Sequence, residues 1–108
     1  MSKEYQTKKG HASRMPRNIY LTCLYLLRST ENVREAARKS LNAEHILWGI
    51  IDAYATIPEQ AYKDALHEYF EKGTQIRFLA PKYATSEKTI SRWKSWLIYA
   101  VAKNLELI

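Results

Sequence analysis

Residues 87–97 carry the side chains best suited to binding chemistry in this chain. Four polar residues recur there at intervals of three and four, which places them on one face of a helix. They are Lys88, Ser91, Arg92 and Ser95. Cationic and hydroxyl side chains contact phosphate oxygens and the edges of bases in the DNA major groove. A merely solvated helix face often has the same composition, so the surrounding elements must decide between the two interpretations.

The sequence predicts the helix that positions these residues over 87–105. Its apolar side chains fall on the opposite face and are Ile90, Trp93, Leu97, Ala100 and Val101. Thr85 or Ser86 can cap its start, because a hydroxyl oxygen accepts a hydrogen bond from an unpaired N–H of the first turn. Glu87 then lies in the first turn, where negative charge is favourable.

A shorter helix and a turn precede it, and residues 74–97 together have the pattern of a helix-turn-helix. In that motif two helices pack at a steep angle and the second enters the major groove. Ala80 is the small residue needed where the helices cross, and Ala84 falls at the turn. The expected buried partners are Leu79, Tyr83, Ile90 and Trp93. Pro81 implies that the first helix is kinked or interrupted, or that it begins near Pro81.

These patterns define a predicted DNA-binding set within the helix-turn-helix. Its members are Arg77, Lys82, Ser86, Lys88, Thr89, Ser91, Arg92, Lys94 and Ser95. Within this set we assign the base contact to Arg92 and phosphate contacts to Lys88 and Lys94. Arg77 and Lys82 are expected to reach the flanking DNA backbone.

The net charge of +6 is distributed unevenly along the 108 residues. Residues 1–17 carry a net charge of +4, and residues 72–108 carry +5. Between them, residues 18–71 contain five basic and eight acidic side chains. Two basic ends favour a polyanionic partner. We expect residues 1–15 to be a flexible basic arm, which either contacts DNA or acts as a solubilising tail.

Periodicity elsewhere predicts one all-α domain over residues 16–108, with no segment of strand period. Further helices are expected over residues 16–29, 30–41, 42–54 and 56–71, and the first two could be continuous. The helix over 16–29 is apolar almost all round, which suggests a central helix or one shared with a second subunit. The expected caps and stops are Thr30, Asn42, a capping box of Thr56 and Glu59, Gly73, and Thr74.

Residues typical of catalysis, metal binding or membrane insertion are not arranged for those roles. His11, His45 and His67 lack metal-ligand spacing, and three scattered glycines form no phosphate loop. Cys23 lies in an apolar run and is expected in the core. The longest apolar run is too short to cross a bilayer, and no secretory signal is visible. We therefore expect no enzyme activity, no cofactor, no metal and no membrane, and a cytoplasmic location.

The last third of the chain resembles phage and prophage late-gene transcription regulators of the RinA/ArpU type. The matching residues are Ser86, Thr89, Arg92 and Trp93, then Ala102, Leu105, Leu107 and Ile108. The resemblance implies a helix-turn-helix like that of sigma-factor region 4, sequence-specific binding of double-stranded DNA, and transcription regulation near the nucleoid of a bacterial host. RNA polymerase is a further partner that it suggests.

Two other functions compete with that of a transcription regulator. A DNA-recognition subunit of a phage packaging terminase would use the same motif within a ring, and a helical adaptor would bind protein without specific DNA binding. The helix over 87–105 has about twice the three turns that reading a groove requires. Its second half should therefore pack on earlier helices or on a partner chain, and with the apolar helix over 16–29 this suggests a homodimer.

Overall fold

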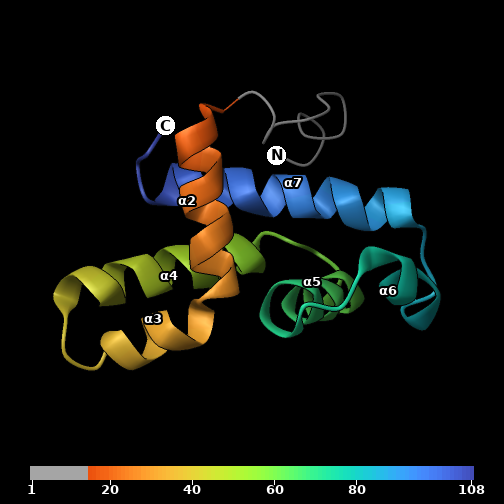
Figure 1. Ribbon diagram of the computed structural model, residues 1–108, viewed down its shortest axis with the longest axis horizontal. Coiled ribbons are helices and arrows are strands. Elements are labelled where there is room, and N and C mark those ends of the chain that lie inside the picture. The colour runs from red at the N-terminus through yellow and green to blue at the C-terminus, as the bar shows by residue number, and fades with distance from the viewer. Residues whose placement is uncertain (1–14) are drawn as a thin grey trace.

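The longest helix, α7 (Glu87–Asn104), spans the described molecule, and α2, α4, α5 and α6 all pack against it (Figure 1). The computed structural model describes residues 15–108, which contain six helices and no strand. The five helices that precede α7 are α2 (Arg17–Arg28), α3 (Thr30–Ala36), α4 (Leu41–Ala55), α5 (Gln60–Lys72) and α6 (Ile76–Lys82). The all-α fold predicted from the sequence is confirmed.

Helix α7 is buried on one face along its first half and on most of its surface along its second half. The predicted apolar face is confirmed, since each of its five residues is buried. Trp96, Ile98 and Ala102 are buried as well, so the second half of α7 is covered on other sides too. Figure 1 shows the reason, because α2 crosses α7 steeply near its C-terminal end. The second half of α7 therefore packs on earlier helices, one of the two arrangements that we expected.

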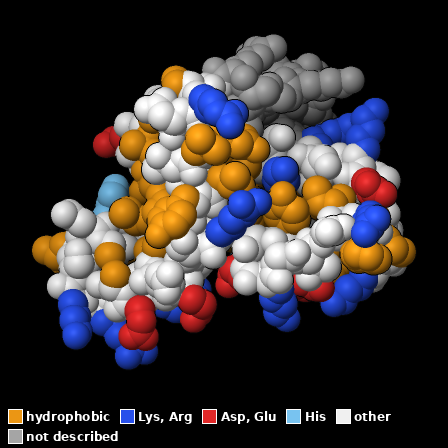
Figure 2. Space-filling model, viewed as in Figure 1, with side chains coloured by type: hydrophobic (Ala, Val, Ile, Leu, Met, Phe, Trp, Pro, Cys, Tyr) orange, Lys and Arg blue, Asp and Glu red, His pale blue; other side chains and the backbone are white. Residues whose placement is uncertain are grey.

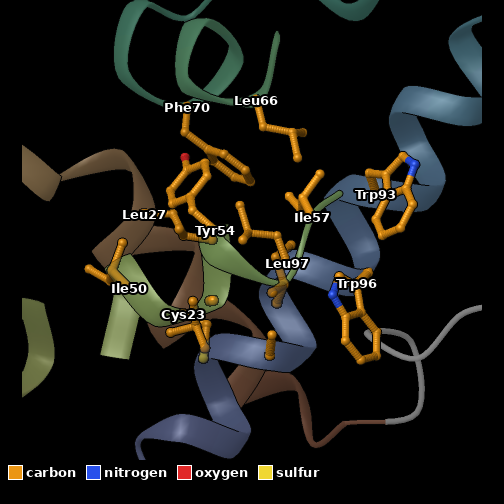
Figure 3. Packing of buried hydrophobic residues seen from close by; sticks show 14 of the residues in the cluster. Cys23, Leu27, Ile50, Tyr54, Ile57, Leu66, Phe70, Trp93, Trp96 and Leu97 are labelled. Carbon is orange, nitrogen blue, oxygen red and sulfur yellow. The ribbon is translucent and has the colours of Figure 1, made fainter. Parts of the chain in front are cut away.

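The centre of the core lies where α5 meets α4 and α7. In Figure 3, Leu66 and Phe70 point from α5 toward Ile57, Tyr54 and the α7 side chains around Leu97. Leu66, Ile57 and Leu97 are at most 1% exposed. Complete burial of one such side chain stabilises the fold by about 2 kcal/mol. The C-terminal helix is thus part of the core and is not an appendage.

A hydrogen-bonded chain connects α7 to the end of α4. Trp96 Nε1 donates to Thr56 Oγ1 over 2.8 Å, and Thr56 Oγ1 donates to the Ala53 carbonyl over 2.7 Å. Thr56 is thereby the C-cap of α4. The predicted capping box is wrong, because α5 begins after Glu59 without a side-chain cap and the Thr56 hydroxyl already serves α4 and α7.

Side chains at the C-terminal end of α7 lie against the α4 backbone at Gly49. Asn104 Nδ2 donates to the Gly49 carbonyl over 2.9 Å. A Cβ atom on Gly49 would lie 2.6 Å from Leu105 Cδ2, closer than real Cβ contacts. The missing side chain therefore allows the end of α7 to rest against α4.

The predicted caps of α3 and α4 are wrong. Ser40, and not Asn42, caps α4 by accepting from the Ala43 N–H. Thr30 Oγ1 donates back to the Leu27 carbonyl over 2.8 Å, so it does not cap α3. Ser29, with φ −107 and ψ 22, separates α2 from α3. Gly73, with φ 74, ends α5 as predicted.

Helix α2 is not the central helix that its apolar sequence suggested. Cys23 and Leu27 face the core, whereas Leu21 is 43% exposed and Tyr25 is 66% exposed. Burial raises the pKa of the Cys23 thiol to about 11, which keeps it protonated at neutral pH. The predicted arm over residues 1–15 lies outside the described residues, apart from Met15 at the edge of the core. Between residues 15 and 108, no helix combines the length and apolar composition needed to cross a bilayer.

Replacing Thr56 with valine should test the connection between α4 and α7. Thr56→Val removes the acceptor of the Trp96 N–H and should lower the free energy of unfolding by about 1 kcal/mol. Thr56→Ser keeps the hydroxyl and should lower the free energy of unfolding clearly less. Urea unfolding followed by tryptophan fluorescence measures both variants. Equal losses for the two would show that packing, and not the hydrogen bond, holds Trp96.

Candidate nucleic-acid interface

Helices α6 and α7 are joined by a tight turn with defined hydrogen bonds. The Thr85 N–H donates to the Ala80 carbonyl over 2.8 Å, and the Ala84 N–H donates to the Pro81 carbonyl over 3.2 Å. Ala84 has φ 53, a left-handed conformation that glycine usually adopts. Together these features form a Schellman C-cap, which ends α6 and reverses the chain direction. The residue that we assigned to the turn thus has the backbone that a turn requires.

Pro81 lies one residue before the end of α6. The helix therefore does not begin near Pro81, which was one of our two alternatives. Proline removes the hydrogen bond to the Arg77 carbonyl, but the bond two residues later is intact, since the Tyr83 N–H donates to the Leu79 carbonyl over 2.9 Å. Pro81 is tolerated because α6 ends immediately after it.

Helix α6 packs on α7, and four of the residues that the spacing indicated for this packing are buried. Leu79 and Ala80 on α6 are 0% and 6% exposed, and Ile90 and Trp93 on α7 are 1% and 8% exposed. A small side chain at position 80 allows the two helices to come close. Tyr83, which was also expected to be buried, is half-buried.

Ser86 is the N-cap of α7, which resolves the choice between Thr85 and Ser86. Its Oγ accepts from the Thr89 N–H over 3.1 Å and donates to Thr89 Oγ1 over 2.9 Å. Glu87 lies in the first turn, as the sequence indicated. Ser86 and Thr89, both in the predicted DNA-binding set, therefore fix the start of the helix.

The predicted polar residues on the outward side of α7 lie in its first three turns. Lys88, Ser91 and Arg92 are exposed and Ser95 is half-buried. Farther along, Ile98 and Ala102 are 0% exposed, whereas Tyr99 is half-buried and Lys103 is exposed. We call Lys88, Ser91, Arg92 and Ser95 the outward face of α7. Its length matches the part of a helix that reads a major groove.

The remaining basic residues of the predicted set lie off the outward face of α7. Lys94 is half-buried, and its Nζ lies 5.2 Å from the centre of the Tyr69 ring on α5. Lys82 Nζ lies 2.8 Å from Glu68 Oε1. The Arg77 guanidinium lies 4.8 Å from the centre of the exposed Phe78 ring. Figure 2 shows Lys and Arg side chains around the end of the molecule where α6 lies, with acidic side chains among them.

Glu68 on α5 holds α6 and its turn in place, and local sequence periodicity did not reveal it. Its carboxylate accepts from Thr74 Oγ1 over 3.2 Å, from Lys82 Nζ over 2.8 Å and from Tyr83 Oη over 3.0 Å. Thr74 therefore does not cap α6, which begins after Gln75. The hydrogen bond from Lys82 lowers the pKa of Glu68 below its usual 4.5, although desolvation opposes the shift. The same bond raises the pKa of Lys82.

The pocket between α5 and α6 has acidic walls and does not suit a polyanion. It is lined by Asp64, His67, Glu68, Glu71, Lys72 and Tyr83. His67 stacks on the Tyr54 ring at 3.9 Å, and its Nδ1 lies 2.6 Å from Glu71 Oε2. No three His, Cys, Asp or Glu side chains within residues 15–108 are grouped so that they could hold a metal ion.

Comparisons of the chain with protein families, with curated proteins and with solved structures found no match. The geometry of α6, the turn and α7 is therefore the basis on which a function can be argued.

Replacing Ala84 with glycine should stabilise the protein. Ala84→Gly relieves the left-handed strain at φ 53 and should raise the free energy of unfolding by about 1 kcal/mol. Ala61→Gly, at an exposed position of α5, is the matched control and should lower stability instead. Urea unfolding of both variants gives the comparison. A loss at both positions would mean that Ala84 is not held at positive φ.

The role of Glu68 predicts a pH-dependent stability. A carboxyl group whose pKa is lowered by folding stabilises the protein above its unfolded pKa, and this contribution disappears as the pH falls through the folded value. Glu68→Gln should therefore be less stable than the wild type at neutral pH, and the two should converge in acid. Glu35→Gln, on an exposed pair with Arg38, is the control and should show little difference. If the stability difference between the wild type and Glu68→Gln is the same at all pH values, Glu68 does not have this role.

Proposed function

We propose that the protein binds double-stranded DNA sequence-specifically, with the first three turns of α7 in the major groove, as a phage-type regulator of transcription. The observation that carries the proposal is the combination of the α6–α7 turn with the outward face of α7. The turn and the buried side of α7 fix the helix on α6, while Lys88, Ser91 and Arg92 are directed away from the core. Regulation of transcription rests on the resemblance of residues 71–108 to the late-gene regulators.

The outward face of α7 has the chemistry that base readout needs. An arginine guanidinium can donate two hydrogen bonds to O6 and N7 of guanine, and Arg92 is the arginine of this face. Ser91 can donate to or accept from several base edges, so it adds contact with less discrimination. Lys88 can pair with a phosphate on the rim of the groove.

The start of α7 supports docking through the helix N-terminus. Unpaired N–H groups and the helix dipole give this end partial positive charge, which favours a nearby phosphate. Ser86 uses its hydroxyl to fix the first turn, so the backbone geometry there is already formed before DNA binds. Lys82 could reach a phosphate only by exchanging its bond to Glu68, and it is therefore a weaker candidate for the flanking contact.

The competing functions differ in measurable ways. A ring of eight or more copies would support a packaging subunit, whereas a monomer or dimer would support a regulator. A protein-binding adaptor would bind specific and random duplexes equally, because its affinity would come from charge alone. A bound sequence selected from random duplexes, followed by competition with unselected duplex, separates the adaptor from both DNA-binding functions.

Replacing Arg92 with alanine should weaken binding to the selected duplex. Arg92→Ala should cost about 1–3 kcal/mol of binding free energy and relax the preference at one base position. Fluorescence anisotropy at fixed salt measures affinity for the selected duplex and for its single-position variants.

Arg38→Ala is the matched control for this experiment. It makes the same charge change in the turn that follows α3, at a side chain that is 76% exposed and paired with Glu35. Figure 1 places α3 away from the first turns of α7, so this variant should keep its base preference. If Arg92→Ala behaves like Arg38→Ala, Arg92 does not read the DNA.

A further inference from the structure

The outer face of α4 is apolar although it faces away from the core. Leu41 is 84% exposed, Trp48 is 56% exposed and Ile51 is 37% exposed. Together with the exposed residues Glu44 and Ala55, they occupy positions 41, 44, 48, 51 and 55. This alternation of three and four residues is the pattern by which one helix packs lengthwise on another. We call these five residues the α4 stripe.

We propose that the α4 stripe binds a second copy of this chain, with the two α4 helices antiparallel about a two-fold axis near Trp48. This inference deepens the proposed function, because such a dimer carries two outward faces of α7. Its consequence for DNA binding rests on the proposed function. In an isologous contact of this kind the same surface is used twice, so the α4 stripe must be complementary to itself.

Charge complementarity sets the antiparallel orientation. A parallel pair would bring each Glu44 beside the same residue of the other copy, inside the contact, and would bring Asp52 close to its equivalent. In the antiparallel pair about Trp48, Leu41 lies opposite Ala55 of the second copy, and Glu44 lies beside Ile51, on the flank away from Asp52. His45 lies near Asp52 of the second copy, and the two-fold axis repeats this contact. All of these residues are exposed. Like charges that meet in such a contact destabilise it, which favours the antiparallel form.

The size of the α4 stripe indicates a weak dimer. The exposed parts of Leu41, Trp48 and Ile51 amount to roughly 300 Å² per copy, judged from the full areas of large apolar side chains. Two such faces amount to roughly 600 Å² of apolar surface, about half of the lower limit of 1,200 Å² for specific interfaces, so the contact without DNA is weak. Trp48 lies at the centre of the stripe, where a tryptophan contributes most to binding.

A weak dimer would be strengthened by DNA. When two copies bind neighbouring half-sites on one duplex, the second contact becomes intramolecular and the α4 interface forms at high effective concentration. The two-fold axis relates the two α7 helices, so the half-sites would be inverted repeats.

The interface is tested first without DNA, by sedimentation of the full chain at high micromolar concentration. The wild type should show reversible self-association, and Trp48→Glu should be monomeric over the same range. Trp48 is an exposed residue, so circular dichroism should show an unchanged helix content. The proposal would be overturned if the wild type did not self-associate, or if Trp48→Glu self-associated as strongly as the wild type.

A charge swap then tests the orientation. His45→Glu should weaken self-association about tenfold, because two carboxylates then face each other twice. The double variant His45→Glu with Asp52→Lys should restore it. If the double variant is as weak as His45→Glu alone, the antiparallel arrangement is wrong.

The affinity of Trp48→Glu for a duplex with a single half-site distinguishes a failure of the α4 interface from a failure of the proposed DNA binding. Unchanged affinity there, with loss of cooperative binding to an inverted repeat, supports both the interface and the DNA-binding function. Self-association without any specific DNA binding would refute the proposed function and support the interface.

Discussion

The fold depends on the burial of the second half of α7, where one helix meets α2, α4 and α5. Ile98, Val101 and Ala102 are completely buried there, and Asn104 rests on the Gly49 backbone where α4 lacks a side chain. Because this half is enclosed, its direction is fixed by the core of the molecule. The first three turns continue the same rigid helix beyond the crossing of α2, so their polar side chains are held in position by contacts made elsewhere.

A second constraint acts at the other end of α7, where α6 must be held without a large core. Helix α6 has seven residues and buries Leu79 and Ala80, which gives it little packing of its own. Glu68 compensates by accepting three hydrogen bonds, from Thr74 before α6 and from Lys82 and Tyr83 at its end. One carboxylate on α5 thereby orients both ends of α6, and the turn through Ala84 passes this orientation on to the start of α7.

Local pattern predicted the elements well and their contacts poorly. The apolar face of α7, the stop at Gly73 and the alternative cap Ser86 all follow from spacing and side-chain chemistry within one turn, and all agree with the structure. Thr30 and Thr56 were assigned to the wrong helix ends. Their hydroxyls bond to a preceding helix and, for Thr56, to Trp96, which is 40 residues away. The role of Glu68 was missed for the same reason, since its partners lie 6, 14 and 15 residues away.

The difference between local spacing and contacts of distant residues also explains which part of the predicted DNA-binding set forms one surface. Lys88, Ser91, Arg92 and Ser95 share a face because a single helix fixes their relative positions, and sequence spacing is sufficient to see this. Lys94 and Lys82 were included for their charge, but Tyr69 and Glu68 on α5 occupy their charged groups. Those contacts arise from the packing of α5 against α6 and α7, which no local pattern encodes. The exposed hydrophobic residues of α4, Leu41, Trp48 and Ile51, are a similar case, because periodicity identifies an apolar stripe without indicating which molecule covers it.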